Sequence, residues 1–184
     1  MTTMVPKRVF FTRGVGKHPR NLESFEAALR NARIAHFNLV KVSSIYPPGC
    51  KIVSRRVGIS NMVPGQIVYC VMAEARTNEP NRLVSAGVGL AVPARGERYG
   101  YISEHHGYGM TVRKTADFVE DMAASMLAET LGIEFNIDDD YDERREVYRM
   151  SGQIVHSRAT VQTAEGDKNG RWTTVVAAAV FLFD

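Results

Sequence analysis

The sequence predicts an α+β fold in which two largely antiparallel sheets pack face to face and helices cover their outer faces. Three runs, 67–73, 83–92 and 175–180, are apolar at both odd and even positions, which is typical of strands covered on both sides. Two amphipathic segments, 21–33 and about 111–131, predict helices. Two helices are too few to cover every apolar strand, so we expect each sheet to cover the inner face of the other.

Length and composition predict one globular domain over residues 1–184. The chain is 45% hydrophobic and 23% charged, with a net charge of only +3 and scattered Lys and Arg, which argues against a nucleic-acid-binding protein. We expect no contact with a membrane and a cytoplasmic location, because no apolar run reaches the ~18 residues of a membrane span and the first residues lack a secretory pattern. Cys50 and Cys70 stand far apart, so neither a zinc ribbon nor a dithiol motif is predicted.

The first elements are a strand at 8–12, a turn at Gly14-Val15-Gly16 and the helix at 21–33, with Asn21 as its N-cap. The glycine pair lacks the third glycine of a dinucleotide fingerprint, so we expect no such site. Leu22 and Glu26 belong to this helix. Glu26 lies beside the apolar stripe of the helix, so it either belongs to the solvated face or points into a cleft at the boundary.

A second strand begins near Asn38, where Val40 and Val42 alternate with Lys41. Pro47 and Pro48 end the strand, because neither has an N–H group to donate to a neighbouring strand. Ser43 and Ser44 lie between strand and prolines. They are either ordinary turn residues or serines held in a strained, functional backbone.

The later elements predict a strand at 99–104, a glycine-punctuated loop at 105–109 and the long helix, with Thr111 as its N-cap and Gly132 past its end. We expect residues 138–142 to form an acidic, solvated loop, because they lack the glycine and the distal glutamate of a calcium-binding EF-hand loop. Strand signals at 147–161, a hairpin turn at 165–170 and a strand at 173–183 complete the chain.

Two kinds of catalytic site find little support in the residues. A serine hydrolase would pair Ser44 with His105, His106 or His156, but the sequence has no G-x-S-x-G elbow. A metal site would use His105, His106 and Glu104, but neighbouring residues of a strand point to opposite faces. We therefore predict no metal.

A third possibility is that Ser44 is the precursor of a cofactor. Removal of CO₂ from an amino acid requires an electron sink such as pyridoxal phosphate. The chain shows no strong phosphate cradle, so we expect no pyridoxal phosphate. A ketone made from the backbone of the chain would serve the same purpose through a Schiff base.

Residues 38–45, with Pro47 and Pro48 after them, resemble the self-cleavage segment of pyruvoyl-dependent arginine decarboxylases. Residues 22–38 are similar to the first helix and lead-in of that family, and 101–107 to its catalytic-acid segment, so the resemblance covers nearly the whole chain. It implies a four-layer αββα sandwich. It also implies a homotrimer of cleaved protomers, which can dimerise further, with active sites between subunits.

The resemblance implies that the chain cleaves itself between Ser43 and Ser44. The Ser44 hydroxyl attacks the carbonyl of Ser43 to give an ester, and elimination and hydrolysis then leave a pyruvoyl group, derived from Ser44, and ammonia. Residues 1–43 become a small chain, and the rest becomes a larger one. Asn38 matches the residue that assists cleavage, where its amide would stabilise an oxyanion.

The implied reaction is decarboxylation of L-arginine to agmatine. Glu104 matches the proton donor, a role for which we expect a raised pKa. Glu26 stands where Asp is usual, and its carboxylate suits the guanidinium of the substrate. The substrate-binding residues implied by the match are Leu22, Glu26, Ser43, Ile45 and Glu104. Two alternatives stay open: a pyruvoyl decarboxylase of another amino acid, and an unprocessed, non-catalytic member that only binds ligand.

Overall fold

The computed structural model describes residues 4–60, 62–94, 96–132 and 154–183. The elements in chain order are β1 (Arg8–His18), α1 (Asn21–Ala32), β2 (Asn38–Lys41), β3 (Ile45–Tyr46), β4 (Lys51–Ile52), α2 (Arg55–Ile59), β5 (Ile67–Thr77), β6 (Leu83–Pro93), β7 (Gly100–Tyr108), α3 (Val112–Leu131), β8 (Ile154–Glu165) and β9 (Trp172–Leu182). Within these residues, no helix combines the length and the apolar character that crossing a membrane requires.

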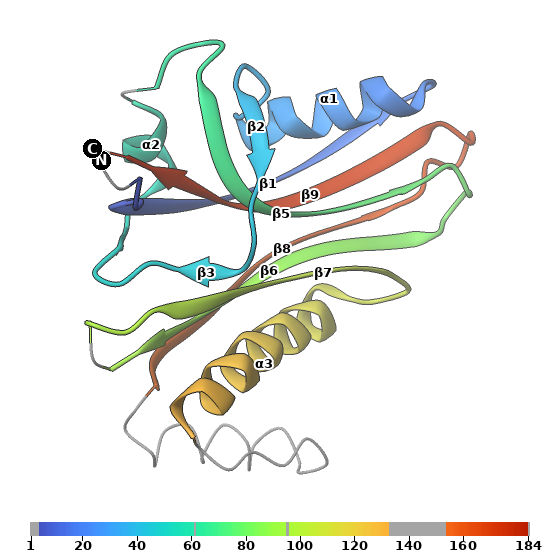
Figure 1. The fold of residues 1–184 in the computed structure, drawn as a ribbon. Coiled ribbons are helices and arrows are strands. Elements are labelled where there is room, and N and C mark those ends of the chain that lie inside the picture. The colour runs from blue at the N-terminus through green and yellow to red at the C-terminus, as the bar shows by residue number, and fades with distance from the viewer. Residues whose placement is uncertain (1–3, 61, 95, 133–153, 184) are drawn as a thin grey trace.

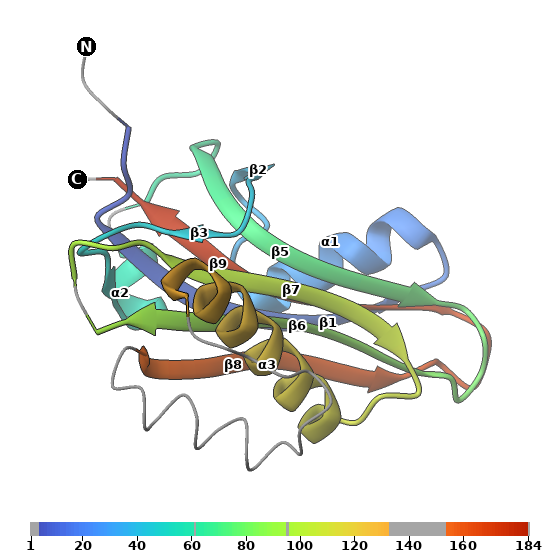
Figure 2. The same cartoon turned by 60° about the horizontal axis from the view of Figure 1, so that its bottom comes forward.

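The strands form two sheets packed face to face. One sheet has the order β2-β5-β9-β1-β4 and the other β3-β7-β6-β8. Helices α1 and α2 cover the outer face of the five-stranded sheet, and α3 covers the outer face of the four-stranded sheet (Figures 1 and 2). The predicted α+β sandwich with four layers in the order αββα is therefore confirmed.

Strand β9 shows why some runs are apolar at every position. Its odd residues, such as Val175, pack in the core between the two sheets. Its even residues, such as Val176, pack under α1 with Phe10 and Ala28. Both faces of β9 are buried, as the sequence pattern indicated.

The predicted turn at Gly14-Val15-Gly16 is wrong, because these residues continue β1 to His18. A Cβ atom on Gly14 would lie 2.2 Å from the carbonyl oxygen of Ala28, and one on Gly16 would lie 2.3 Å from the amide nitrogen of Ala28. The two glycines therefore let α1 approach the sheet closely.

The turn at 165–170 was predicted as a hairpin, but it joins strands of different sheets. Strand β8 pairs with β6, whereas β9 pairs with β1 and β5. The turn residue Gly170 adopts φ 73°, the left-handed conformation that glycine favours. The turn residues were identified correctly, but the pairing inferred from them was not.

Of the remaining predictions, some are confirmed and others are wrong. Thr111 caps α3 by accepting a hydrogen bond from the amide of Lys114, and Gly132 ends the helix at φ 69°. Asn21 does not cap α1, since the N-cap is Arg20 and makes no side-chain bond. Strand β7 extends through the predicted loop to Tyr108, and α2 was not predicted. The acidic loop at 138–142 and residues 147–153 lie outside the described residues.

Candidate active site

The chain crosses from one sheet to the other at Ser43 and Ser44. Strand β2 pairs in parallel with β5, and β3 pairs antiparallel with β7 (Figure 1). On one side of the crossing, the amide of Val42 donates to the carbonyl oxygen of Cys70 at 3.0 Å. On the other side, the amide of Ile102 donates to the carbonyl oxygen of Ser44 at 2.7 Å. The two ends of the crossing are thus held by different sheets.

The backbone makes a tight turn at this crossing. The amide of Ile45 donates to the carbonyl oxygen of Ser43 at 3.0 Å, so the hydrogen bond spans only Ser44. A bond from residue i+2 to residue i is typical of a γ-turn. Ser43 is exposed and Ser44 is half-buried. The Ser43 carbonyl is therefore polarised by an N–H group, next to a serine that solvent can reach.

The two prolines limit β3 to two residues, as the sequence indicated. Pro47 follows Tyr46 directly and has no N–H to continue the ladder with β7. Its carbonyl oxygen accepts from the amide of Cys50 at 3.2 Å, and Gly49 between them adopts φ 68°. This turn leads the chain back to the five-stranded sheet at β4.

An apolar cavity of about 570 Å³ opens beside Ser43. The crossing itself supplies Val42, Ser43 and Ile45 to its wall. The rest of the wall comes from Met4, Val5, Pro6, Pro47, Pro48, Tyr69, Tyr99, Phe181 and Phe183. The rings of Tyr69 and Phe183 meet edge to face at 5.5 Å. No motif pointed to these aromatic residues, because they come from distant strands that only the fold brings together.

Glu104 lies on β7, two residues after Ile102, which holds Ser44. Alternate residues of a strand share a face, so Glu104 is on the face of Ile102, which packs in the core between the sheets. Two residues of a strand span ~7 Å. Glu104 itself is exposed and lies opposite Val88 of β6 in the register. The acid and the serine pair are therefore positioned by one strand.

Asn38 begins β2 and is held away from the serines. Its side-chain amide donates to the carbonyl oxygen of Gly65 at 2.7 Å, and its backbone amide donates to Gln66 at 2.9 Å. In this arrangement the side chain fixes the start of β2. A role at the Ser43 carbonyl would require it to leave Gly65.

Leu22 and Glu26 lie on α1, away from the cavity beside Ser43. Leu22 is 71% exposed. Glu26 forms an ion pair of 3.0 Å with Arg30 and lines a separate cavity of about 540 Å³, together with Arg33, Ala35 and His36. The two cavities share no lining residue. Within one chain the structure therefore does not bring Glu26 to Ser44.

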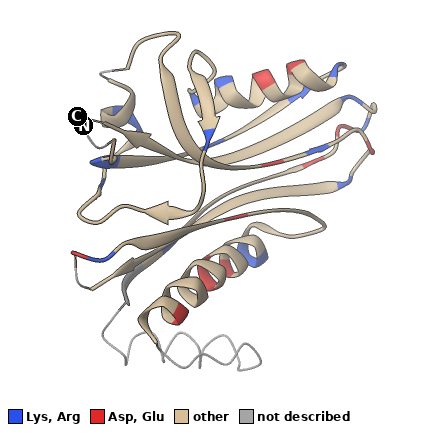
Figure 3. Cartoon of the chain, in the orientation of Figure 1, with Lys and Arg blue, Asp and Glu red and all other residues tan. Residues whose placement is uncertain are grey.

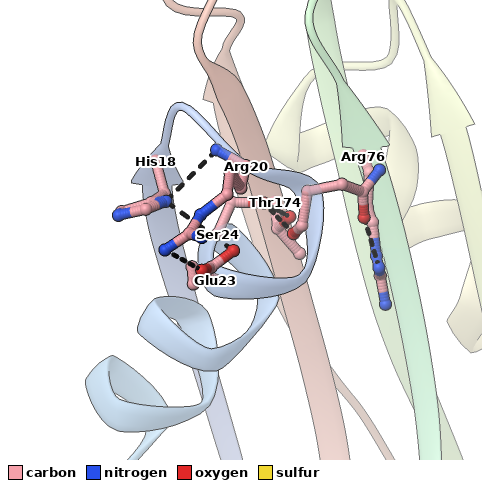
Figure 4. Close-up of polar contacts among 7 residues, drawn as sticks. His18, Arg20, Glu23, Ser24, Arg76 and Thr174 are labelled. Atoms are coloured by element: carbon pink, nitrogen blue, oxygen red, sulfur yellow. Dashed lines mark hydrogen bonds and ion pairs between the residues drawn. The ribbon is translucent and has the colours of Figure 1, made fainter.

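The start of α1 is fixed by buried and partly buried polar contacts (Figure 4). The hydroxyls of Ser24 and Thr174 are 2.6 Å apart, which ties the helix to β9. Arg76 of β5 donates to the side-chain oxygen of Asn21 at 2.6 Å and lies over the ring of Phe25. These contacts set the orientation in which α1 presents Leu22 and Glu26 to solvent.

Charged residues lie mainly on the outer helices and near the ends of strands, while the crossing itself carries only Lys41 at the end of β2 (Figure 3). Lys41 pairs with Glu74 at 3.7 Å. His105 and His106, considered above as metal ligands, lie on neighbouring positions of β7, and His105 packs 4.3 Å from the ring of Phe118 on α3. Burial and the neighbouring His106 lower the pKa of His105. No group of three metal-binding side chains occurs in the described part of the chain.

Comparison with known proteins matches nearly the whole chain to one protein family. The family model for pyruvoyl-dependent arginine decarboxylase matches residues 8–184. A protein of Chloroherpeton thalassium described as a probable pyruvoyl-dependent arginine decarboxylase is 56% identical over 98% of this chain and 99% of its own length. Pyruvoyl-dependent arginine decarboxylase 2 of Methanosarcina acetivorans is 53% identical over 97% of this chain and 98% of its own. A Methanococcoides burtonii protein with the same family name is 52% identical over 97% of this chain.

The four-layer sandwich and these matches define the class of protein as a decarboxylase. The chain belongs to the pyruvoyl-dependent arginine decarboxylase family. The resemblance drawn from residues 38–45 is confirmed at the level of the family.

Proposed function

We propose that this chain cleaves itself between Ser43 and Ser44 to form a pyruvoyl group, and then decarboxylates L-arginine to agmatine. The observation that carries the proposal is the backbone at the crossing. Ser43 follows β2, which is held by β5, and the carbonyl of Ser44 is held by Ile102 of β7. Cleavage of the bond between them leaves each new end hydrogen-bonded to a different sheet.

The serine pair of the crossing supplies the nucleophile and the bond that breaks, and the amide of Asn38 is the further group that we propose to assist cleavage. The Ser44 hydroxyl attacks the carbonyl carbon of Ser43, and the bond from Ser43 to the Ser44 nitrogen breaks as the ester forms. The ester then loses Ser43 as a carboxylate by elimination, and water releases the nitrogen of residue 44 as ammonia. The Ser43 oxygen carries negative charge during the attack. The amide of Ile45, 3.0 Å from that oxygen, supplies a donor of the kind that stabilises such a charge.

The residues around Ser44 fit a pyruvoyl group. A ketone at residue 44 would keep its C-terminal neighbour Ile45 paired with Tyr101 and would open on the exposed Ser43 side. The chemistry that such a ketone supplies is an electron sink, reached through a Schiff base with the substrate amine. Glu104, two residues after Ile102 on β7, is the group that we propose to deliver a proton to the α-carbon, as the family resemblance implies.

The guanidinium of the substrate requires a carboxylate. The cavity beside Ser43 has no Asp or Glu among its lining residues, and Glu26 lies in another cavity. We therefore propose that a second copy of the chain completes the site with Glu26 and Leu22. This separation supports the trimer with shared active sites that the family resemblance implies.

Denaturing electrophoresis and intact-mass analysis of the purified protein test the cleavage. We expect fragments of 43 and 141 residues from the 184-residue chain. The larger fragment should gain mass on treatment with borohydride, which reduces a ketone. Ser44→Ala should remain one full-length chain without activity, whereas Ser60→Ala, at an exposed serine after α2, should cleave normally.

Release of CO₂ and agmatine from L-arginine tests the substrate. A single full-length band with full activity would overturn the pyruvoyl mechanism. Two fragments that release CO₂ from another amino acid but not from arginine would overturn the substrate alone.

A further inference from the structure

A third cavity opens between the sheets at the edge opposite the serine crossing. Strand β4 pairs with β1 only at Arg8 and Val9. Strand β8 is the outermost strand of its sheet (Figure 2). Between these two edges lies a cavity of about 400 Å³. Its lining residues are Phe11, Thr12, Arg13, Arg55, Arg158, Ala159 and Thr160.

Three arginines are among the residues that line this cavity, and each comes from a different element. Arg13 of β1 donates one bond of 2.8 Å to the carbonyl oxygen of Val161. The guanidinium of Arg158 of β8 lies over the ring of Phe11, 5.0 Å from its centroid. Arg55 is the first residue of α2. A guanidinium has five N–H donors, and the bond to Val161 uses one of those of Arg13.

Among the described residues, no Asp or Glu lines this cavity. Among the residues that the structure describes, none of the three arginines forms an ion pair with Asp or Glu. Glu120 of α3 accepts a bond from Ser157, next to Arg158 in sequence, but adjacent residues of a strand point to opposite faces. Three like charges beside one cavity repel one another, and an anion between them would relieve that repulsion.

We propose that this cavity binds a phosphate group, either as inorganic phosphate or carried on a small metabolite. The planar fork of Arg matches the oxygens of phosphate, and stacking on an aromatic ring is a further property of Arg at such sites. A phosphate carries about −1.5 to −2 charges near neutral pH, which balances three guanidiniums better than one carboxylate. The cavity volume also lies in the range of ~300–1,000 Å³ typical of small-molecule sites.

Titration calorimetry of the purified protein with inorganic phosphate and with glycerol 3-phosphate tests the proposal. We expect saturable binding of at least one of them, weakening as salt is raised. Arg158→Met keeps an apolar stem over Phe11 but removes the charge, and Arg55→Gln removes the charge from α2. Each should weaken binding about tenfold or more, because a hydrogen bond to a charged group is lost.

Arg113→Gln is the matched control, since Arg113 is on α3, its side chain is 92% exposed and it pairs with Asp117. It should bind phosphate as the unmodified protein does. Tighter binding of glycerol 3-phosphate would identify a metabolite as the ligand, and equal affinity would identify the phosphate group alone. The proposal is overturned if neither compound binds at millimolar concentration, or if folded Arg55→Gln and Arg158→Met proteins bind as tightly as Arg113→Gln.

Discussion

The amide of Ile102 donates a hydrogen bond of 2.7 Å to the carbonyl oxygen of Ser44. This bond ties the crossing between the sheets to β7, whose register with β6 places Glu104 opposite Val88. Ser44 and Glu104 therefore hold their relative positions through the backbone of a single strand. Residues positioned by a paired strand are held more precisely than residues on a loop.

Glu104→Gln should separate cleavage from turnover. The amide keeps the shape of the carboxyl group but cannot give up a proton as a general acid, so turnover should fall about 10²–10⁴-fold. Cleavage should proceed normally, because it needs the serines and not Glu104. The measurements are CO₂ release and the two-fragment pattern on the same preparation. Turnover equal to that of the unmodified enzyme would remove Glu104 from the proton-donor role.

Asn38→Ala tests whether the amide of Asn38 acts beyond its bond to Gly65. If the amide also stabilises the oxyanion at Ser43, its loss should slow the appearance of the two fragments about 10²–10³-fold. Loss of the bond to the Gly65 carbonyl alone should cost about 1 kcal/mol of stability and leave cleavage unchanged. A time course of cleavage after synthesis distinguishes the two. Normal cleavage with only a lower melting temperature would limit Asn38 to a structural role.

The sequence predicted those parts of the fold that depend on local pattern. Because Val175 and Val176 face different cores, the run that contains them is apolar at both odd and even positions. Glycine was misleading, because it serves both turns and close packing. Gly14 was predicted in a turn, but it makes room for Ala28 of α1. The turn at 165–170 could be identified from its own residues, but these residues do not show that the strands on either side, β8 and β9, belong to different sheets.

Only the part of the candidate site that lies in one continuous segment could be predicted from the sequence. Ser43 and Ser44 belong to a contiguous motif, which family resemblance can identify. The cavity beside them depends on Tyr69 and Phe183, which come from strands far apart in sequence. The distance of Glu26 from that cavity also depends on how α1 packs on the sheet, and residue spacing along the helix carries no such information.

Gly14→Ala should destabilise the protein by overpacking α1 against β1. The added Cβ would lie 2.2 Å from the carbonyl oxygen of Ala28 and 2.6 Å from the amide nitrogen of Ala32. Both are backbone atoms, so the helix must shift, at a cost of about 1–3 kcal/mol in the free energy of unfolding. Gly96→Ala is the control, since nothing lies within 4 Å of its Cβ position. Chemical denaturation should give near-native stability for the control, and equal stability of both variants would contradict the packing argument.

Ionisation of the Cys70 thiol in the unfolded chain should lower the free energy of unfolding at alkaline pH. Burial raises the pKa of the Cys70 thiol from 9.0 to about 11, with Lys41 lowering it and Glu104 raising it. The folded state thus favours the neutral thiol. The contribution of this group to stability is complete below pH 9 and is lost as pH rises to about 11, where the unfolded chain has already released the proton. Each pKa unit corresponds to about 1.4 kcal/mol, so the loss should approach about 2–3 kcal/mol.

Cys70→Ala isolates this contribution from the other alkaline groups. Tyr46, whose pKa burial raises to about 12, and Cys50, whose pKa burial raises to about 11, remain in the variant and keep their own pH dependence. The alanine variant starts less stable because it leaves a small gap in the core under α1. Its free energy of unfolding should nevertheless fall less steeply between pH 9 and pH 11 than that of the unmodified protein. Urea denaturation at a series of pH values measures both slopes, and identical slopes would show that Cys70 keeps an ordinary pKa in the folded protein.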